Sequence, residues 1–249
     1  MWQELGVDHV ALISQKVEPL GWEPARKLIT DAHLRLSTIF GPIPIPLDTD
    51  PRTGQREAER ETIARILEFA AAVGSRSVYL CTGSMASLTW EEAADAFCEA
   101  IAPLIPLSDA LGVPLAVEAT NSLLADVSFV YSLRDGLDLA RAAGVKVVLD
   151  VFSCWYERGL DELVRKNVDQ IALVQLSDFV IGTHETGNRV VPGDGDLPLA
   201  RLVSMVLDAG YEGPFDLEIM GPRMDSEGYP SAIRRSVERA SELLDRCGA

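Results

Sequence analysis

The strongest constraint on the fold is a repeat of short apolar runs, each followed by a longer amphipathic segment. Most runs are apolar throughout rather than alternating, which is typical of strands buried on both faces of a parallel sheet. In the longer segments apolar residues recur at helical spacing, and several of these segments end at a glycine. The order of strand, helix, glycine and strand predicts βα units joined by right-handed crossovers.

The pattern predicts seven strands and five main helices. The predicted strands are His9–Ser14, Leu34–Phe40, Ser77–Thr82, Leu115–Ala119, Val145–Asp150, Ile171–Asp178 and Phe215–Ile219. The predicted helices are Arg56–Val73, Trp90–Leu111, Ser128–Ala143, Leu197–Ala209 and Ser231–Arg246. Thr89, with Glu92 three residues later, has the sequence signature of a capping box before the second helix.

This organisation predicts one TIM-type (β/α) barrel domain over residues 1–249, since about 250 residues is a normal length for that fold. A closed barrel has eight strands, whereas the sequence shows seven. We interpret Trp2–Gly6 as part of the helix that would follow a first strand. Either the barrel is open at one place, or the missing strand comes from elsewhere, or our interpretation of the first residues of the chain is wrong. Oligomer contacts are one way to cover open strand edges, so we expect a homo-oligomer.

Charge and cysteine content exclude several classes of function. Lys and Arg number 22 against 38 Asp and Glu, a formal net charge of −16. This acidity argues against nucleic acid and against an anionic membrane surface as partners. The four cysteines form no C-x-x-C pair, which fits a reducing compartment. No secretory signal and no bilayer-spanning apolar stretch is visible, so we expect a cytoplasmic protein.

Four consecutive predicted strands each carry a polar residue near the carboxyl end, where a barrel builds its site. Such groups are costly to bury unless they are paired or metal-bound. One acidic residue at a strand end is more often a helix cap or a salt-bridge partner, but four in succession favour a metal or acid–base site. These residues are Glu118, Asp150, Gln175 and Glu218.

Five stretches together carry a resemblance to a known family: Ala116–Asn121, Val147–Asp150, Val174–Asp178, Asn188–Asp196 and Asp216–Ile219. From about Glu57 onward the chain resembles the sugar isomerase/epimerase superfamily with the xylose-isomerase-like TIM barrel. The resemblance implies that Glu118, Asp150, Gln175 and Glu218 hold a divalent metal, and that Glu118 and Glu218 also move protons on opposite faces of the substrate. Because all four ligands offer oxygen, Mg²⁺ or Mn²⁺ is favoured over zinc.

The resemblance also implies substrate contacts, and here the sequence departs from the family. Arg189 is an implied substrate contact, with a solvated loop arginine as the alternative. Ser153 stands where many relatives carry a substrate-binding His, and it cannot carry a proton near neutral pH. Gln175 replaces a His ligand, so we expect weaker metal binding. Asn121 in its motif and His184 in the long loop Phe179–Pro198 complete the candidate contacts, although His184 is also typical of a solvated loop residue.

Three functions remain open at this point. The first is a metal-dependent isomerase or epimerase of a small keto sugar, keto acid or cyclitol-like substrate. The second is a lyase or dehydratase that uses the same site, because the missing His and the sequence Cys154-Trp155-Tyr156 change the pocket. These aromatic residues could instead pack onto the next helix. The third is a non-catalytic barrel that binds a ligand or partner.

The superfamily also includes endonucleases for abasic DNA, which hold several zinc ions with many His ligands. This acidic chain has only three His, so we set an endonuclease function aside.

Overall fold

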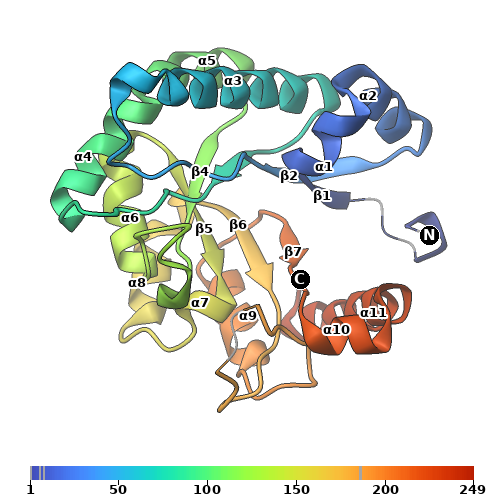
Figure 1. Ribbon diagram of the computed structural model, residues 1–249. Coiled ribbons are helices and arrows are strands. Elements are labelled where there is room, and N and C mark those ends of the chain that lie inside the picture. Colours follow the sequence, from blue (N-terminus) through green and yellow to red (C-terminus); the bar gives the residue numbers. More distant parts are fainter. Residues whose placement is uncertain (1, 6, 8, 185–186) are drawn as a thin grey trace. The chain divides into compact units, whose positions relative to one another are not determined.

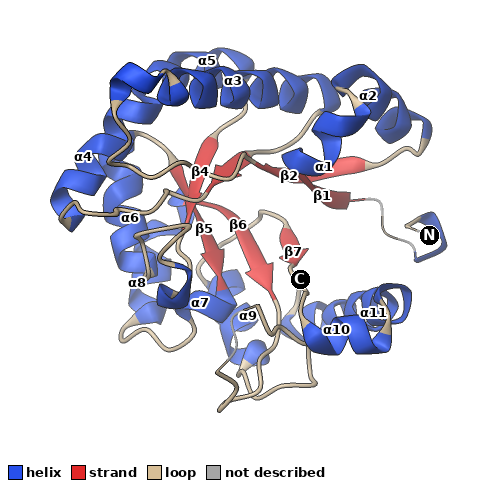
Figure 2. Ribbon diagram, viewed as in Figure 1, coloured by secondary structure: helices blue, strands red, loops and turns tan. Residues whose placement is uncertain are grey.

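The computed structural model covers residues 1–249 and describes all of them except 1, 6, 8, 185 and 186. Its described part contains seven strands that follow one another in chain order from β1 to β7 (Figures 1 and 2). Every pair with a defined register is parallel. The strands are β1 His9–Ile13, β2 Arg35–Phe40, β3 Val78–Leu80, β4 Leu115–Glu118, β5 Lys146–Asp150, β6 Ile171–Leu176 and β7 Phe215–Leu217.

All seven predicted strands are confirmed, and their observed ends lie within two residues of the predicted ends. Strands β4 and β5 are buried along almost their whole length, as their uninterrupted apolar sequences indicate. Strands β1 and β7, the first and last of the sheet, are partly exposed instead. In place of the helical segment expected at Trp2–Gly6 the chain forms a 3₁₀ turn, Gln3–Leu5, and Gly6 lies outside the described residues.

The helices correct two predicted boundaries. The helix expected over Trp90–Leu111 is interrupted by a 3₁₀ turn, Ala102–Leu104, because Pro103 and Pro106 have no N–H to donate. The helix expected from Ser128 starts later, where the Ser132 side chain accepts the Asp135 N–H. The α-helices are α1 Ser14–Val17, α2 Trp22–Asp31, α3 Gln55–Val73, α4 Trp90–Ile101, α5 Ile105–Leu111, α6 Leu133–Ala143, α7 Val151–Cys154, α8 Leu160–Asn167, α9 Leu199–Asp208, α10 Pro222–Glu227 and α11 Tyr229–Cys247.

The predicted capping box at the start of α4 and the predicted glycines at the ends of α3 and α6 are confirmed. The capping box of α4 is complete, since Thr89 Oγ1 accepts the Glu92 N–H at 3.3 Å and Glu92 Oε2 accepts the Thr89 N–H at 2.9 Å. Helices α3 and α6 end at Gly74 and Gly144, whose φ values of 68° and 73° lie in the left-handed region that glycine adopts without strain.

The chain divides into two compact units: residues 8–148, and residues 149–249 together with 1–7. In the first unit α3 and α5 run side by side (Figure 1), and Ile39, Ile66 and Val117 lie in its core. In the second unit α11 packs on α9, and Val191, Met224 and Ala232 form a buried cluster. The single domain expected from the sequence stays a prediction.

No helix within the described ranges has the length and apolar character needed to cross a bilayer.

Candidate functional site

The second unit brings the ends of its strands together around polar side chains. Asp150 is the last residue of β5, Gln175 lies in β6, and Glu218 follows β7 directly. Gln175 pairs in register with Asp216. Because side chains alternate along a strand, Asp216 and Glu218 point to the same side of β7. The Asp-x-Glu spacing therefore delivers a further carboxylate, Asp216, that the sequence analysis had quoted in a motif without assigning it to the site.

Arg189 is the cation of this group. Its guanidinium binds Asp150 with both arms, Nη1 to Oδ1 at 3.0 Å and Nη2 to Oδ2 at 3.0 Å. Nη2 also lies 3.2 Å from Glu218 Oε2. The side chains of Asp150, Arg189 and Glu218 are 0%, 6% and 22% exposed. The interpretation of Arg189 as a solvated loop residue is therefore wrong.

Asp150 is held by its own helix as well. It caps α7, since its Oδ1 accepts the Phe152 N–H at 3.0 Å. Ser153, one turn later, donates its hydroxyl to Oδ2 at 2.8 Å. The Phe152 ring centroid lies 4.5 Å from the Arg189 guanidinium carbon, a cation–π contact. Ser153 is thus placed on Asp150, and its expected contact with substrate stays a prediction.

The loop that carries Arg189 is organised by Asp178, a residue that the sequence analysis did not single out. Its buried carboxylate accepts four backbone N–H groups from the loop: Phe179 at 2.8 Å, Gly193 at 2.8 Å, Gly195 at 3.1 Å and Leu197 at 3.0 Å. Asp178 and Val190 also form an antiparallel bridge. The Arg189 N–H donates to the Met220 carbonyl at 3.0 Å, which ties the loop to the segment after Glu218. The sequence signal for this role is an Asp at the end of a predicted strand, followed in the loop by the glycines Gly193 and Gly195.

Burial dominates the electrostatics of the two carboxyls on β7. It raises the pKa of Glu218 to about 7; Arg189 opposes this rise, and the charges of Asp150 and Asp216 add to it. Burial also raises the pKa of Asp216 to about 6, against the Leu217 N–H and Arg189. A carboxyl that titrates near neutral pH is suited to proton transfer.

Three further candidates come from other segments of the chain. Glu118 is the last residue of β4, in the first unit, and is 6% exposed; its register partner is Val148, two residues before Asp150 in β5. Asn121 caps a 3₁₀ turn, where its Oδ1 accepts the Leu123 N–H at 2.9 Å. His184 is exposed in the loop after β6, and residues 185 and 186 of that loop lie outside the described residues. The roles of all three stay predictions.

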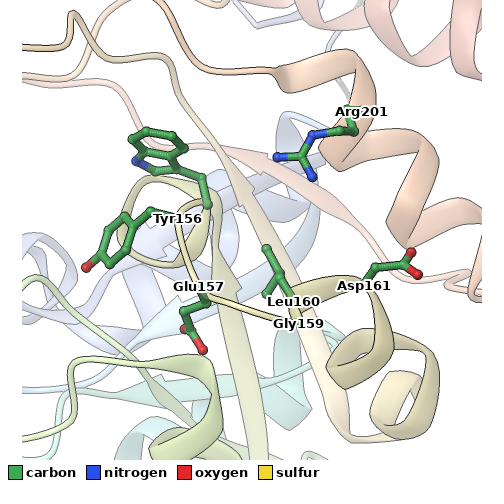
Figure 3. A pocket seen from close by; sticks show the side chains of 7 residues that line it. Tyr156, Glu157, Gly159, Leu160, Asp161 and Arg201 are labelled. Carbon is green, nitrogen blue, oxygen red and sulfur yellow. The ribbon is translucent and has the colours of Figure 1, made fainter.

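A cavity of about 460 Å³ lies beside the segment that follows α7 (Figure 3). Trp155 and Tyr156 meet edge to face at 5.7 Å between ring centroids. Arg201 reaches from α9 toward this segment. The sequence left open whether these aromatic residues line a pocket or pack onto the next helix, and both of them line this cavity. The carboxylate cluster contributes nothing to the lining, which consists of Trp155, Tyr156, Glu157, Gly159, Leu160, Asp161 and Arg201.

Comparisons with known proteins bear on the whole chain. Residues 2–246 match the family model described as "Xylose isomerase-like TIM barrel". The structure is similar to that of protein SMc04130 from Sinorhizobium meliloti 1021, with a TM-score of 0.86 and 24% identity over 97% of this chain and 90% of that one. It is similar to the IolI protein with a bound zinc atom, with a TM-score of 0.81 and 16% identity over 100% and 92%.

A third similar structure is that of an L-ribulose 3-epimerase, with a TM-score of 0.78 and 16% identity over 98% of this chain and 86% of that one. Identities this low show a shared fold, not a shared reaction. No curated protein matches the sequence. The expected fold class, an α/β barrel of the xylose isomerase-like TIM type, is confirmed by the family match.

Proposed function

Because this chain belongs to the xylose isomerase-like TIM barrel family, we propose that it is a divalent-metal-dependent isomerase or epimerase. Its substrate would be a small keto sugar, keto acid or cyclitol-like molecule. One observation carries the proposal: the buried group of Asp150, Arg189 and Glu218 at the ends of β5 and β7. Burying carboxylates costs free energy even when a counter-charge is present. A buried cluster of this kind is therefore more typical of a functional site than of an ordinary core.

The chemistry of the donors fits a divalent metal. Asp150 and Glu218 each offer a carboxylate oxygen, and these atoms lie within 4.8 Å of each other. Glu218 Oε2 is buried and lies 3.2 Å from Arg189 Nη2, but it accepts no hydrogen bond from the residues that the structure describes, which leaves it a lone pair to share. We propose Asp150 and Glu218 as ligands, joined by the amide oxygen of Gln175 and by Glu118 at the end of β4. The all-oxygen set favours Mg²⁺ or Mn²⁺, while a zinc atom is bound in the similar IolI structure.

In the proposed reaction the protein supplies two carboxylates and a positioned cation. The metal, when bound, would polarise the substrate carbonyl and make the adjacent C–H acidic. Glu218 removes the proton from the carbon next to the carbonyl, and Glu118 returns a proton to the other face or to the neighbouring carbon. The planar fork of Arg189 binds a substrate hydroxyl or carboxylate oxygen. Ser153 and the Phe152 N–H keep Asp150 oriented.

Solvent exchange tests the proposal directly. The protein is incubated with Mn²⁺ or Mg²⁺ and a panel of ketoses and keto acids in D₂O, and deuterium at the carbon next to the carbonyl is followed by NMR. We expect exchange with the wild type and a loss of roughly 10² to 10⁴ fold in Glu218→Gln and in Glu118→Gln. Glu212→Gln, an exposed glutamate of the same unit, is the matched control and keeps wild-type turnover. Intact turnover in both test variants contradicts the proposal.

Product analysis in the same experiment separates the alternative reactions. An isomerase or epimerase conserves the formula of its substrate, whereas a lyase or dehydratase begins with the same proton removal and then loses water or another group. The placement of Ser153 on Asp150 is the observation that keeps the lyase in view, because the position carries no imidazole to protonate substrate. A protein that binds no divalent ion and turns over no substrate would instead be a non-catalytic barrel.

A further inference from the structure

Arg189 and a divalent metal need the same oxygens. An ionised carboxylate has about four positions at which it accepts hydrogen bonds. Asp150 Oδ1 accepts from the Phe152 N–H and from Arg189 Nη1, and Oδ2 accepts from Ser153 Oγ and from Arg189 Nη2. All four positions of Asp150 are therefore taken, and a metal can bind this carboxylate only when one donor leaves.

Arg189 is the donor that can leave. The Phe152 N–H belongs to the backbone of α7, and Ser153 is buried in the same turn, so both are fixed by the helix that Asp150 caps. The guanidinium, in contrast, ends a long side chain and carries a positive charge, so a divalent cation repels it. The guanidinium also contacts the Glu218 carboxylate, the Ser177 hydroxyl at 3.2 Å and the face of Phe152, and the last two can keep it nearby after release.

We propose that Arg189 is an internal counter-ion that competes with the divalent metal for Asp150, and that metal binding releases its guanidinium toward substrate. This inference rests on the proposed function, which identifies the cluster as a metal site. It adds that Arg189 controls whether the metal can bind there. In the metal-free protein Arg189 is the counter-charge that Asp150 and Glu218 share. With metal in place that charge is redundant, and the fork gains free N–H groups for a substrate oxygen.

Metal affinity tests the competition without any substrate. The dissociation constant for Mn²⁺ is measured at fixed pH by the EPR signal of the free ion, for the wild type, Arg189→Met and Arg201→Met. We expect Arg189→Met to bind Mn²⁺ at least tenfold more tightly, because it removes both the competing donor and a repelling charge. Arg201→Met removes the same charge from an exposed position of α9 and stays within twofold of wild type. Unchanged or weaker binding by Arg189→Met overturns the inference.

A second measurement uses the unaltered protein, so it decides the question even if Arg189→Met does not fold. The Nε–Hε signal of Arg189 is followed by ¹⁵N NMR during titration with Mg²⁺. We expect this signal to shift in step with saturation, and a signal that stays in place at saturation overturns the inference.

The two proposals fail in different ways. If the wild type binds no metal at millimolar concentration, the proposed function fails. Tight binding by Arg189→Met would then still support the competition, and absence of binding by the variant as well would refute it.

Discussion

Asp178→Asn is the change that tests how Arg189 is positioned. The substitution keeps the size of the side chain but replaces one acceptor oxygen by an NH₂ group, which cannot accept a hydrogen bond. Each oxygen of Asp178 accepts two backbone N–H groups of the loop. Whichever way the amide is oriented, two of the four N–H groups then face another donor.

The expected loss follows from these two orphaned groups. A buried donor left without a partner costs about 1–3 kcal/mol, so two cost roughly 2–6 kcal/mol. Gly193 is exposed, so water can satisfy part of the demand if the lost oxygen is the one it uses. We therefore expect the free energy of unfolding to fall by about 2–4 kcal/mol, together with faster exchange of the amide hydrogens of residues 190–198.

Urea unfolding followed by circular dichroism gives the first quantity, and hydrogen exchange with mass spectrometry gives the second. Asp196→Asn is the matched control on the same loop, because exposed Asp196 accepts one N–H through its side chain, that of Ile181 at 2.9 Å. We expect the control to lose less than about 1 kcal/mol. A loss for Asp178→Asn no larger than that of the control, with unchanged exchange in the loop, would refute the role given to this carboxylate.

Two further predictions concern the same unit. Gly221→Ala is expected to lower stability by at least about 2 kcal/mol, since its φ is +113° and a Cβ would lie 2.3 Å from the Gly187 carbonyl oxygen; Gly248→Ala, at φ +89° with open space around it, should lose less in thermal unfolding. In chelator-treated protein the stability contributed by Glu218, whose pKa rises from 4.5 to about 7 on folding, is fully present below pH 4.5 and lost by about pH 7. Glu218→Gln should remove this fall of roughly 3 kcal/mol, and an identical pH profile in wild type and variant would contradict the assignment.

The strands were predictable because their signal is local. Each run is recognised from a few consecutive apolar residues, and the seven runs of the sequence are the seven strands of the described chain. The places where prediction failed are also local in cause. Pro103 and Pro106 break a helix whose apolar spacing continues across them, and the next helix, expected from Ser128, begins only after its cap at Ser132. The periodicity of apolar residues alone does not show which residue lacks an N–H or supplies a cap.

The partners of Arg189 were not predictable in the same way. Arg189 lies 39 positions after Asp150 in the sequence, and the chain between them includes β6 and a long loop. The pairing therefore depends on how Asp178 folds that loop back onto its own strand. A motif could mark Arg189 as a site residue, but only the folded loop shows that its fork lies on Asp150. Asp216 escaped notice for another reason, since one acidic residue within a short strand is indistinguishable from an exposed one until its side of the sheet is known.

The position of Ser153 narrows the chemistry that the site can perform. A serine three residues after a helix-capping Asp reaches back to that carboxylate, and Ser153 donates to Asp150 in this way. Its hydroxyl is thus used to orient Asp150, and it has no pKa near neutrality with which to exchange protons. In the proposed reaction, proton transfer therefore falls to carboxyl groups. Glu218 meets this requirement within the second unit, because burial and the neighbouring charges of Asp150 and Asp216 bring its pKa to about 7 while Arg189 limits the rise.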